Sequence, residues 1–165
     1  MKEALVDAEF IVAIRLRGLS GLNPVARRTL RSLRLDRKHR AVILEKKPET
    51  TGMLKSVKDI VTWGDAGEQT IDFLLKKRGR ITGGQRLTDE IVKSKLGKST
   101  VSDLATALAR SEVSLDKLWS SGVKSTFRLR PPRGGFKGSI KRPFKDRGEL
   151  GNRGTMIHDL VTRMA

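Results

Sequence analysis

Apolar and other residues alternate in two short stretches of the chain, and a period of two is typical of β-strands. The clearest is EFIVAIRLR at 9–17, where every second residue from Phe10 to Leu16 is apolar. Successive side chains of a strand point to opposite faces, so this pattern predicts a strand with that set in a core. Arg15 and Arg17 then lie on the other face, which we expect to be partly exposed and basic.

Two more strands are predicted at 40–46 and 125–130. The first is apolar in its middle, which favours a central strand, and the second alternates until Pro131 ends it. Between the strands, apolar residues recur every three or four positions, as in amphipathic helices. One helix begins after Asn23-Pro24, and a second begins near Pro48 and covers 50–60. Residues 61–63 either end that second helix or begin another extended segment.

The middle of the chain, 65–121, has only helical patterns. One helix is predicted at 68–78, with cations in its last turn, and another at 89–96, with acids in its first turn. Both placements suit the helix dipole. Thr100 and Asp103 fit a capping box, and Ser114 is placed to cap a short helix that ends near Trp119. We therefore expect a small helical module here.

These elements predict an α+β fold with a small three-stranded sheet in the order β-α-β-α-β, ferredoxin-like in character. Both helices of this core are expected on one face, which leaves Arg15, Arg17, Arg128 and Arg130 on the other. The predicted organisation has three parts: 1–64 is the first part of the core, and 65–121 is a helical insertion. The third part, 122–165, holds the last core strand, a basic Gly/Pro-rich extension and a C-terminal helix.

The charge of the chain gives the first indication of its function. The chain has 35 basic and 18 acidic residues in 165, a net charge of +17. Residues 1–64 and 122–165 carry net charges of +7 and +8, whereas 65–121 carries +2. Self-repulsion at this charge destabilises a compact state unless a polyanion lies nearby, and nucleic acid is the commonest polyanion.

The first predicted helix carries a stripe of cations, with Arg27, Arg31 and Arg34 at helical spacing and Arg28 beside them. A solvated face is the usual interpretation of such a stripe. Here no acid interrupts it before Asp36, and like charges four residues apart destabilise a helix by a few tenths of a kcal/mol per pair, on the order of 0.3. The arrangement therefore favours phosphate contact.

The stretch 127–154 is rich in glycine, proline and cations, with nine cations against two acids. Its few apolar residues predict a segment that is disordered alone and ordered on RNA, with a purely solubilising tail as the alternative. Glycine lets the backbone approach phosphates closely. The complete set of candidate RNA-binding residues is Arg15, Arg17, Arg27, Arg28, Arg31, Arg34, Arg128, Arg130, Arg133, Lys137, Lys141, Arg142, Lys145, Arg147 and Arg153.

The residues give little support for a metal site, an enzyme active site or a membrane-bound role. The chain has no cysteine, and its two histidines, His39 and His158, are far apart, so neither a metal nor a cofactor is expected. No nucleophile stands beside a candidate base, so we expect no enzyme and no small-molecule substrate. No apolar run is long enough to cross a bilayer, so no membrane partner is expected. With no tyrosine, base stacking is a minor mode at most.

Four motifs together resemble the large-subunit ribosomal protein thirty family in its long, archaeal-type form. They are IVAIRLRG at 11–18, TGMLKSVKDIVTWG at 51–64, LKKRGRITGGQRLTDE at 75–90 and FRLRPPRGGFKGSIKRPF at 127–144. The resemblance implies a cytoplasmic, structural component of the large ribosomal subunit that takes part in translation. It implies large-subunit ribosomal RNA as the main partner, the small ribosomal RNA of that subunit as a further candidate, and neighbouring ribosomal proteins.

Two alternatives stay open at this point. The first is an RNA chaperone or another non-ribosomal nucleic-acid-binding protein, including one that compacts DNA; a preference for duplex DNA over structured ribosomal RNA would support it. A small RNA-processing enzyme would need a catalytic carboxylate, and no residue is nominated for it.

Overall fold

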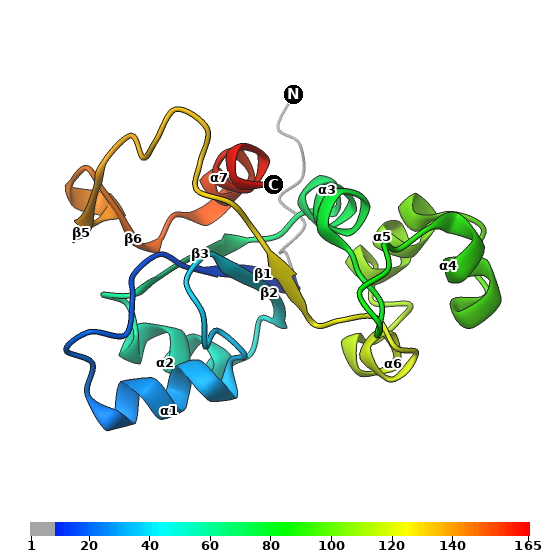
Figure 1. Ribbon diagram of the computed structural model, residues 1–165, viewed down its shortest axis with the longest axis horizontal. Coiled ribbons are helices and arrows are strands. Elements are labelled where there is room, and N and C mark those ends of the chain that lie inside the picture. Colours follow the sequence, from blue (N-terminus) through cyan, green and yellow to red (C-terminus); the bar gives the residue numbers. More distant parts are fainter. Residues whose placement is uncertain (1–8) are drawn as a thin grey trace.

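The computed structural model describes residues 9–165, so the first eight residues of the predicted 1–64 part lie outside the described residues. The fold is α+β, with one mixed sheet between two layers of helices (Figure 1). The strands are β1 (Phe10–Arg15), β2 (Arg40–Glu45), β3 (Val61–Asp65), β4 (Thr126–Arg128), β5 (Ser139–Pro143) and β6 (Gly148–Asn152). The helices are α1 (Pro24–Ser32), α2 (Pro48–Ser56), α3 (Glu68–Arg78), α4 (Asp89–Leu96), α5 (Val101–Ala109), α6 (Leu115–Ser120) and α7 (Ile157–Met164).

The sheet has six strands in the order β4-β2-β1-β3-β6-β5, so the prediction of three strands was wrong. β1 lies between β2 and β3 and is antiparallel to both. The third strand of the core is β3, formed by residues that the pattern left ambiguous between helix and strand. β4, the strand predicted for that role, pairs with the outer side of β2. Residues 61–63 directly follow the predicted helix and are too few to show a periodicity that separates a strand from a helix end.

One face of the sheet packs on α1 and α2, as predicted. Ile11 and Ala13 of β1 point to this side, where they join Leu30 of α1, Leu54 of α2 and Trp63 of β3 in one buried cluster. Figure 1 shows both helices below the sheet. Asn23 begins α1 by accepting a hydrogen bond from the amide of Val25 at 3.0 Å, and Pro24 follows in the first turn, where its missing amide is not needed.

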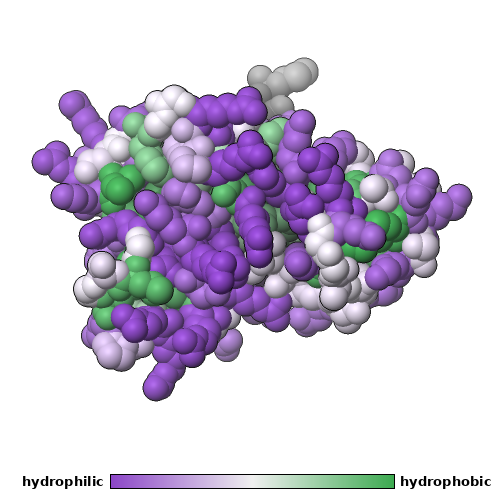
Figure 2. Space-filling model, in the orientation of Figure 1, coloured by the Kyte–Doolittle hydropathy of each residue, from purple (hydrophilic) through white to green (hydrophobic). Residues whose placement is uncertain are grey.

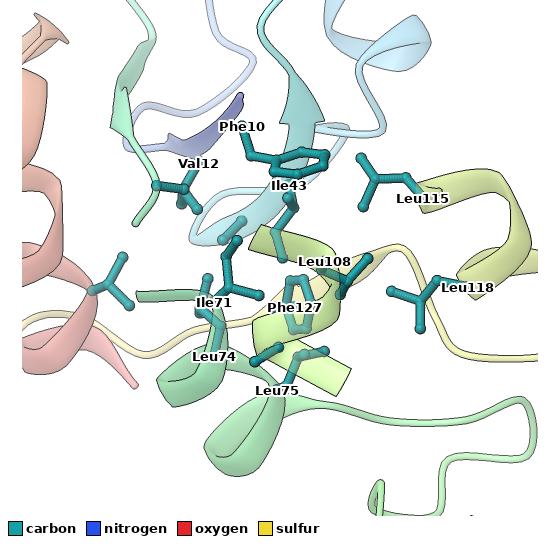
Figure 3. Packing of buried hydrophobic residues seen from close by; sticks show 14 of the residues in the cluster. Phe10, Val12, Ile43, Ile71, Leu74, Leu75, Leu108, Leu115, Leu118 and Phe127 are labelled. Atoms are coloured by element: carbon teal, nitrogen blue, oxygen red, sulfur yellow. The ribbon is translucent and has the colours of Figure 1, made fainter. Parts of the chain in front are cut away.

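The opposite face is covered, so the expectation of an open basic face was wrong. Phe10, Val12 and Ile14 lie in a larger cluster with residues of α3, α5 and α7. Figure 3 shows Phe127 of β4 among Ile71 and Leu74 of this cluster. The apolar sides of the helices of 65–121 thus share one buried cluster with this face of the sheet. The boundaries at 64/65 and 121/122 stay predictions about chain organisation, although the two parts share this core.

The helices of the insertion begin where the sequence indicates. α3 and α4 have the predicted bounds. At α5 the capping box is complete, because the Thr100 hydroxyl accepts from the amide of Asp103 and the Asp103 carboxylate accepts from the amide of Thr100, both at 3.1 Å. Ser114 caps α6 by accepting from the amide of Lys117 at 3.3 Å. Local side-chain chemistry therefore defines these helix starts.

The basic extension is ordered in its second half, contrary to the prediction of disorder. β6 pairs with β3 in parallel, and β5 pairs with β6 in parallel at the edge of the sheet. The turn between β5 and β6 contains Arg147 in the left-handed conformation, with φ of 57°. Gly148 follows with no room for a side chain, because a Cβ there would overlap the carbonyl group of Arg142. Pairing with an existing strand edge supplies the order that apolar composition alone does not.

A prediction follows for Gly64, which lies in β3 directly under the start of α7. A Cβ at this position would lie 2.7 Å from the Cβ of Ile157 and would also overlap the carbonyl oxygen of Gly154. We expect Gly64→Ala to lower the free energy of unfolding by about 1–3 kcal/mol through overpacking. Urea denaturation followed by circular dichroism measures this change.

The matched control is Gly52→Ala, inside α2, where a Cβ meets no atom within 4 Å. This variant should raise the free energy of unfolding by roughly 0.5–1 kcal/mol, because alanine is the better helix former. The two glycine substitutions should therefore shift stability in opposite directions. Equal effects would show that β3 and α7 are not packed as described.

Candidate nucleic-acid interface

Thirteen of the fifteen predicted RNA-binding cations have exposed side chains, and two are buried. The exposed residues are Arg17, Arg27, Arg28, Arg31, Arg34, Arg128, Arg130, Arg133, Lys137, Lys141, Arg142, Lys145 and Arg147. Figure 2 shows a face of the molecule on which hydrophilic residues predominate and apolar residues gather in small areas. Twelve of the exposed cations form three groups, carried by α1, by the segment from β4 onward, and by β5 with the turn to β6. Arg17 lies apart from them, directly after β1, where its Nη1 donates to the carbonyl of Asp59 at 3.1 Å.

The α1 group consists of Arg27, Arg28, Arg31 and Arg34. The helix buries Leu30 against the sheet, so its other sides carry the arginines outward. Arg34 follows the helix in the left-handed conformation, with φ of 59°, and its guanidinium donates to the hydroxyl of Ser125. Within residues 9–165 no carboxylate forms an ion pair with any of the four. These charges are therefore available to a ligand.

The β4 group consists of Arg128, Arg130 and Arg133, and its backbone is fixed by the last residues of the chain. The amide of Arg130 donates to the carbonyl of Met164 at 2.8 Å, and the amide of Arg133 donates to the carbonyl of Arg163 at 3.0 Å. The side chains of the three predicted arginines remain exposed. A fixed backbone with free cationic side chains is a preorganised surface for phosphates, because little backbone entropy is lost on binding.

The β5–β6 group consists of Lys137, Lys141, Arg142, Lys145 and Arg147. β5 is an edge strand with four exposed residues out of five, so its cations extend into solvent. Lys137 is the one member with an ion pair among the described residues, to Asp159 at 3.4 Å, and about three quarters of its side chain is exposed. Cations on an edge strand also prevent pairing with other strands.

Arg15 does not belong to the exposed surface, and the prediction that it lies on an open face was wrong. Its side chain is 1% exposed, donating from Nε to the carbonyl of Arg17 at 2.8 Å and from Nη1 to the carbonyl of Leu35 at 3.0 Å. Burial lowers the pKa of the Arg15 guanidinium, and the nearby charge of Asp36 partly opposes this effect. Arg15 therefore fixes the loops beyond β1.

Arg153 is also buried, at 8% exposure, and serves the fold. Its Nη2 donates to Glu149 Oε2 at 2.6 Å, its Nε donates to Thr62 Oγ1 at 2.9 Å, and its guanidinium carbon lies 4.8 Å from the centre of the Phe144 ring. Glu149 Oε1 in turn accepts from the amide of Gly138 at 2.8 Å. Glu149 lies in β6 and Arg153 directly after it, so their spacing of four residues is not the pairing signal that it would be on a helix.

Sequence reasoning missed other exposed or half-buried cations. Arg40, Arg78, Arg80 and Lys124 come from separate parts of the chain and line one cleft with Arg128. No spacing in the sequence connects them, because the fold of the insertion onto the sheet brings them together. The net charge of the local segment gave no signal for Arg78 and Arg80 either, since 65–121 carries only +2.

The described residues contain no cluster of histidine and carboxylate side chains that could hold a metal ion. Among residues 9–165 there is no helix both long and apolar enough to cross a membrane.

What the structure offers is a set of exposed, mostly unpaired cations on a rigid α+β frame, which is suited to a polyanion with regularly spaced phosphates. These features define a nucleic-acid-binding protein of the α+β class.

Comparison with known proteins makes the assignment specific. Residues 11–61 match the family described as ribosomal protein L30p/L7e. The chain is 47% identical over 154 residues to large ribosomal subunit protein uL30 of Thermofilum pendens, covering 93% of this chain and 97% of that one. It is 43% identical to uL30 of Hyperthermus butylicus, with 99% and 94% covered, and 45% identical to uL30 of Aeropyrum pernix, with 92% and 96% covered. The chain belongs to the uL30 family of large ribosomal subunit proteins.

This membership confirms the resemblance found in the four sequence motifs. It identifies a structural ribosomal protein and not an enzyme. The alternative of a non-ribosomal RNA chaperone receives no support from the comparisons.

The Glu149–Arg153 pair leads to a stability prediction. Both side chains are 5% exposed, so Glu149→Gln leaves a buried guanidinium without its counter-charge. We expect the free energy of unfolding to fall by about 3 kcal/mol. Urea titration at neutral pH measures the change. The control is Asp159→Asn, which removes the exposed partner of Lys137 and should change stability by less than about 1 kcal/mol. Similar losses in both variants would contradict a structural role for Arg153.

Proposed function

We propose that this protein is a structural constituent of the large ribosomal subunit that binds ribosomal RNA mainly through phosphate contacts. In this role it stabilises the folded shape of the RNA. The observation that carries the proposal is that twelve of the thirteen exposed predicted cations have no ion-pair partner among residues 9–165. A polyanion such as RNA supplies the counter-charge that this surface lacks within the chain, and the relatives are large-subunit proteins by name.

The mechanism of binding follows from the geometry. The sheet and its two helical layers hold the α1, β4 and β5–β6 groups at fixed positions, so phosphates at matching positions on a folded RNA are neutralised together. Each neutralised phosphate releases condensed counterions, which gives a log–log salt slope of about −0.7 to −0.9 per contact. Arginine and lysine contacts of this kind recognise RNA shape more than base sequence.

The finer partner assignments belong to the same proposal. Large-subunit ribosomal RNA is the main ligand, the small ribosomal RNA of the subunit is a further candidate, and neighbouring ribosomal proteins complete the surroundings, in the cytoplasm. No cofactor or small-molecule substrate takes part. The order of β5 and β6 supports a role for the extension as a preformed arm, because β6 is already paired to β3.

A variant of the α1 group tests the proposal. Arg27→Gln, Arg28→Gln and Arg31→Gln combined should weaken binding to large-subunit ribosomal RNA and reduce the magnitude of the log–log salt slope by roughly 2, at about 0.7 per contact. Filter binding at a series of salt concentrations measures both. Stability should not fall, because like charges at helical spacing are removed and glutamine is a good helix former.

The control for this experiment is Lys55→Gln with Lys58→Gln, two exposed cations of α2 and the turn after it. We expect the control to change the slope much less than the α1 variant. Equal slopes for wild type and the α1 variant would remove α1 from the interface. Preference of the wild-type protein for duplex DNA over structured ribosomal RNA would overturn the function itself.

A further inference from the structure

A cleft of about 460 Å³ lies where the helical insertion meets the sheet. It is lined by five cations and two uncharged residues, with no acid: Arg40, Arg78, Arg80, Gly84, Lys124, Thr126 and Arg128. Arg40 comes from β2 and Arg128 from β4, whereas Arg78 ends α3 and Arg80 begins the loop after it. We name this site the arginine cleft. It joins the core and the insertion, and only Arg128 was expected to bind RNA.

The strand register places like charges directly opposite each other. Arg40 and Arg128 are partners in the antiparallel pair of β2 and β4. Arg80 and Arg86 are partners in an isolated antiparallel bridge at the rim of the arginine cleft. Like charges at opposed positions destabilise a sheet, so this arrangement lowers the stability of the protein without a ligand. One carboxylate compensates in part, since Arg40 pairs at 2.7 Å with Asp36, which does not line the cleft.

Arg78 is half-buried, and not all of its hydrogen-bond donors have a partner. Its Nη2 donates to the carbonyl of Ala165 at 3.2 Å, whereas its buried Nε has no hydrogen-bond partner. Burial lowers the pKa of Arg78, and the charges of Arg130, Arg80 and Arg86 lower it further. An anion in the cleft would relieve the mutual repulsion of these groups.

We propose that the arginine cleft binds consecutive backbone phosphates of ribosomal RNA, so that one RNA strand crosses the junction between the core sheet and the helical insertion. This inference rests on the proposed function and adds a specific site to it. Five cations exceed what a single phosphate group neutralises, and exposed Arg86 and Arg130 extend the positive charge beyond the lining. An extended chain of phosphates therefore fits better than a small anion. Guanidinium groups suit this ligand because their forked donors bind phosphate oxygens in pairs.

The cleft is held in shape before any ligand arrives. The amide of Lys124 donates to the carbonyl of Arg80 at 2.8 Å, and the amide of Thr82 donates to the carbonyl of Gly122 at 2.8 Å. Arg80 Nη1 donates to the carbonyl of Gly84 at 2.7 Å, which fixes that side chain. Because the two sides are already joined, binding orders few additional groups.

The test compares two double variants of the full chain. Arg80→Gln with Lys124→Gln removes two charges from the arginine cleft. Lys93→Gln with Lys117→Gln removes two exposed charges from α4 and α6, which do not line it. Binding to large-subunit ribosomal RNA is measured across a salt series, and hydroxyl-radical footprinting locates the protected nucleotides. The probe for a small ligand is inorganic pyrophosphate, by calorimetry.

We expect the cleft variant to reduce the magnitude of the salt slope by roughly 1.5, at about 0.7–0.9 per contact, and to lose one continuous protected segment. The control variant should keep that segment. Lys124→Gln alone, whose side chain makes none of the observed hydrogen bonds, should show half the change in slope, and its melting temperature should be at least that of wild type. This single variant keeps the test valid if the Arg80 substitution perturbs the loop.

Three results would overturn the inference. If the wild-type protein binds normally and the cleft variant has an unchanged salt slope and footprint, RNA binding by the arginine cleft is refuted. The proposed function then stays intact. If pyrophosphate binds saturably and RNA does not displace it, the cleft is a small-anion site instead. Failure of the wild-type protein to bind ribosomal RNA at all would refute the proposed function, and the inference with it.

Discussion

The structure depends on one strand that is buried on both of its faces. β1 has no exposed residue, and its two sets of side chains belong to different apolar clusters. Ile11 and Ala13 need a layer of helices on one side, and Phe10, Val12 and Ile14 need another on the opposite side. α1 and α2 supply the first layer, and the helices between β3 and β4, together with α7, supply the second. A three-stranded core with one helical layer would leave Phe10 and Val12 in water.

Burial of charge follows from the same constraint. A strand with both faces covered ends at Arg15, whose guanidinium cannot reach solvent and donates to backbone carbonyl oxygens beyond the strand. Arg153 plays a comparable part beside β3, where Glu149 supplies the counter-charge. Both residues look from the sequence like every other arginine of the chain. A buried guanidinium with satisfied donors orders the surrounding loops, and removing its partner is strongly destabilising. The same residue type thus has a structural role at two positions and lies exposed at many others.

Features set by neighbouring residues could be predicted from the sequence, and contacts between distant segments could not. The starts of α1, α5 and α6 were predictable because the capping side chains lie within three residues of the amides they bind. The strand at Phe10–Arg15 was predictable from its alternation, and the α1 stripe from its helical spacing. The pairing of β6 with β3, the burial of Arg153 and the assembly of the arginine cleft were not, because each brings together segments far apart in the sequence, as it does Arg153 with Thr62 and Arg40 with Arg78. Such contacts are fixed by the packing of the second helical layer, for which no local pattern exists.

Net charge is therefore a poor guide to where this protein carries its positive potential. The segment 65–121 has a net charge of only +2, yet Arg78 and Arg80 of that segment lie beside Arg40 and Arg128 of the sheet. Four of the eight acids of the segment are elsewhere, in the first turns of α3 and α4 and in the capping box of α5. There they stabilise helix N-termini, while cations at the end of α3 stabilise its C-terminus. Helix electrostatics thus separates the charges of a nearly neutral segment. Because α3 ends next to β4, its cations are added to those of the sheet, and the field is concentrated at the junction.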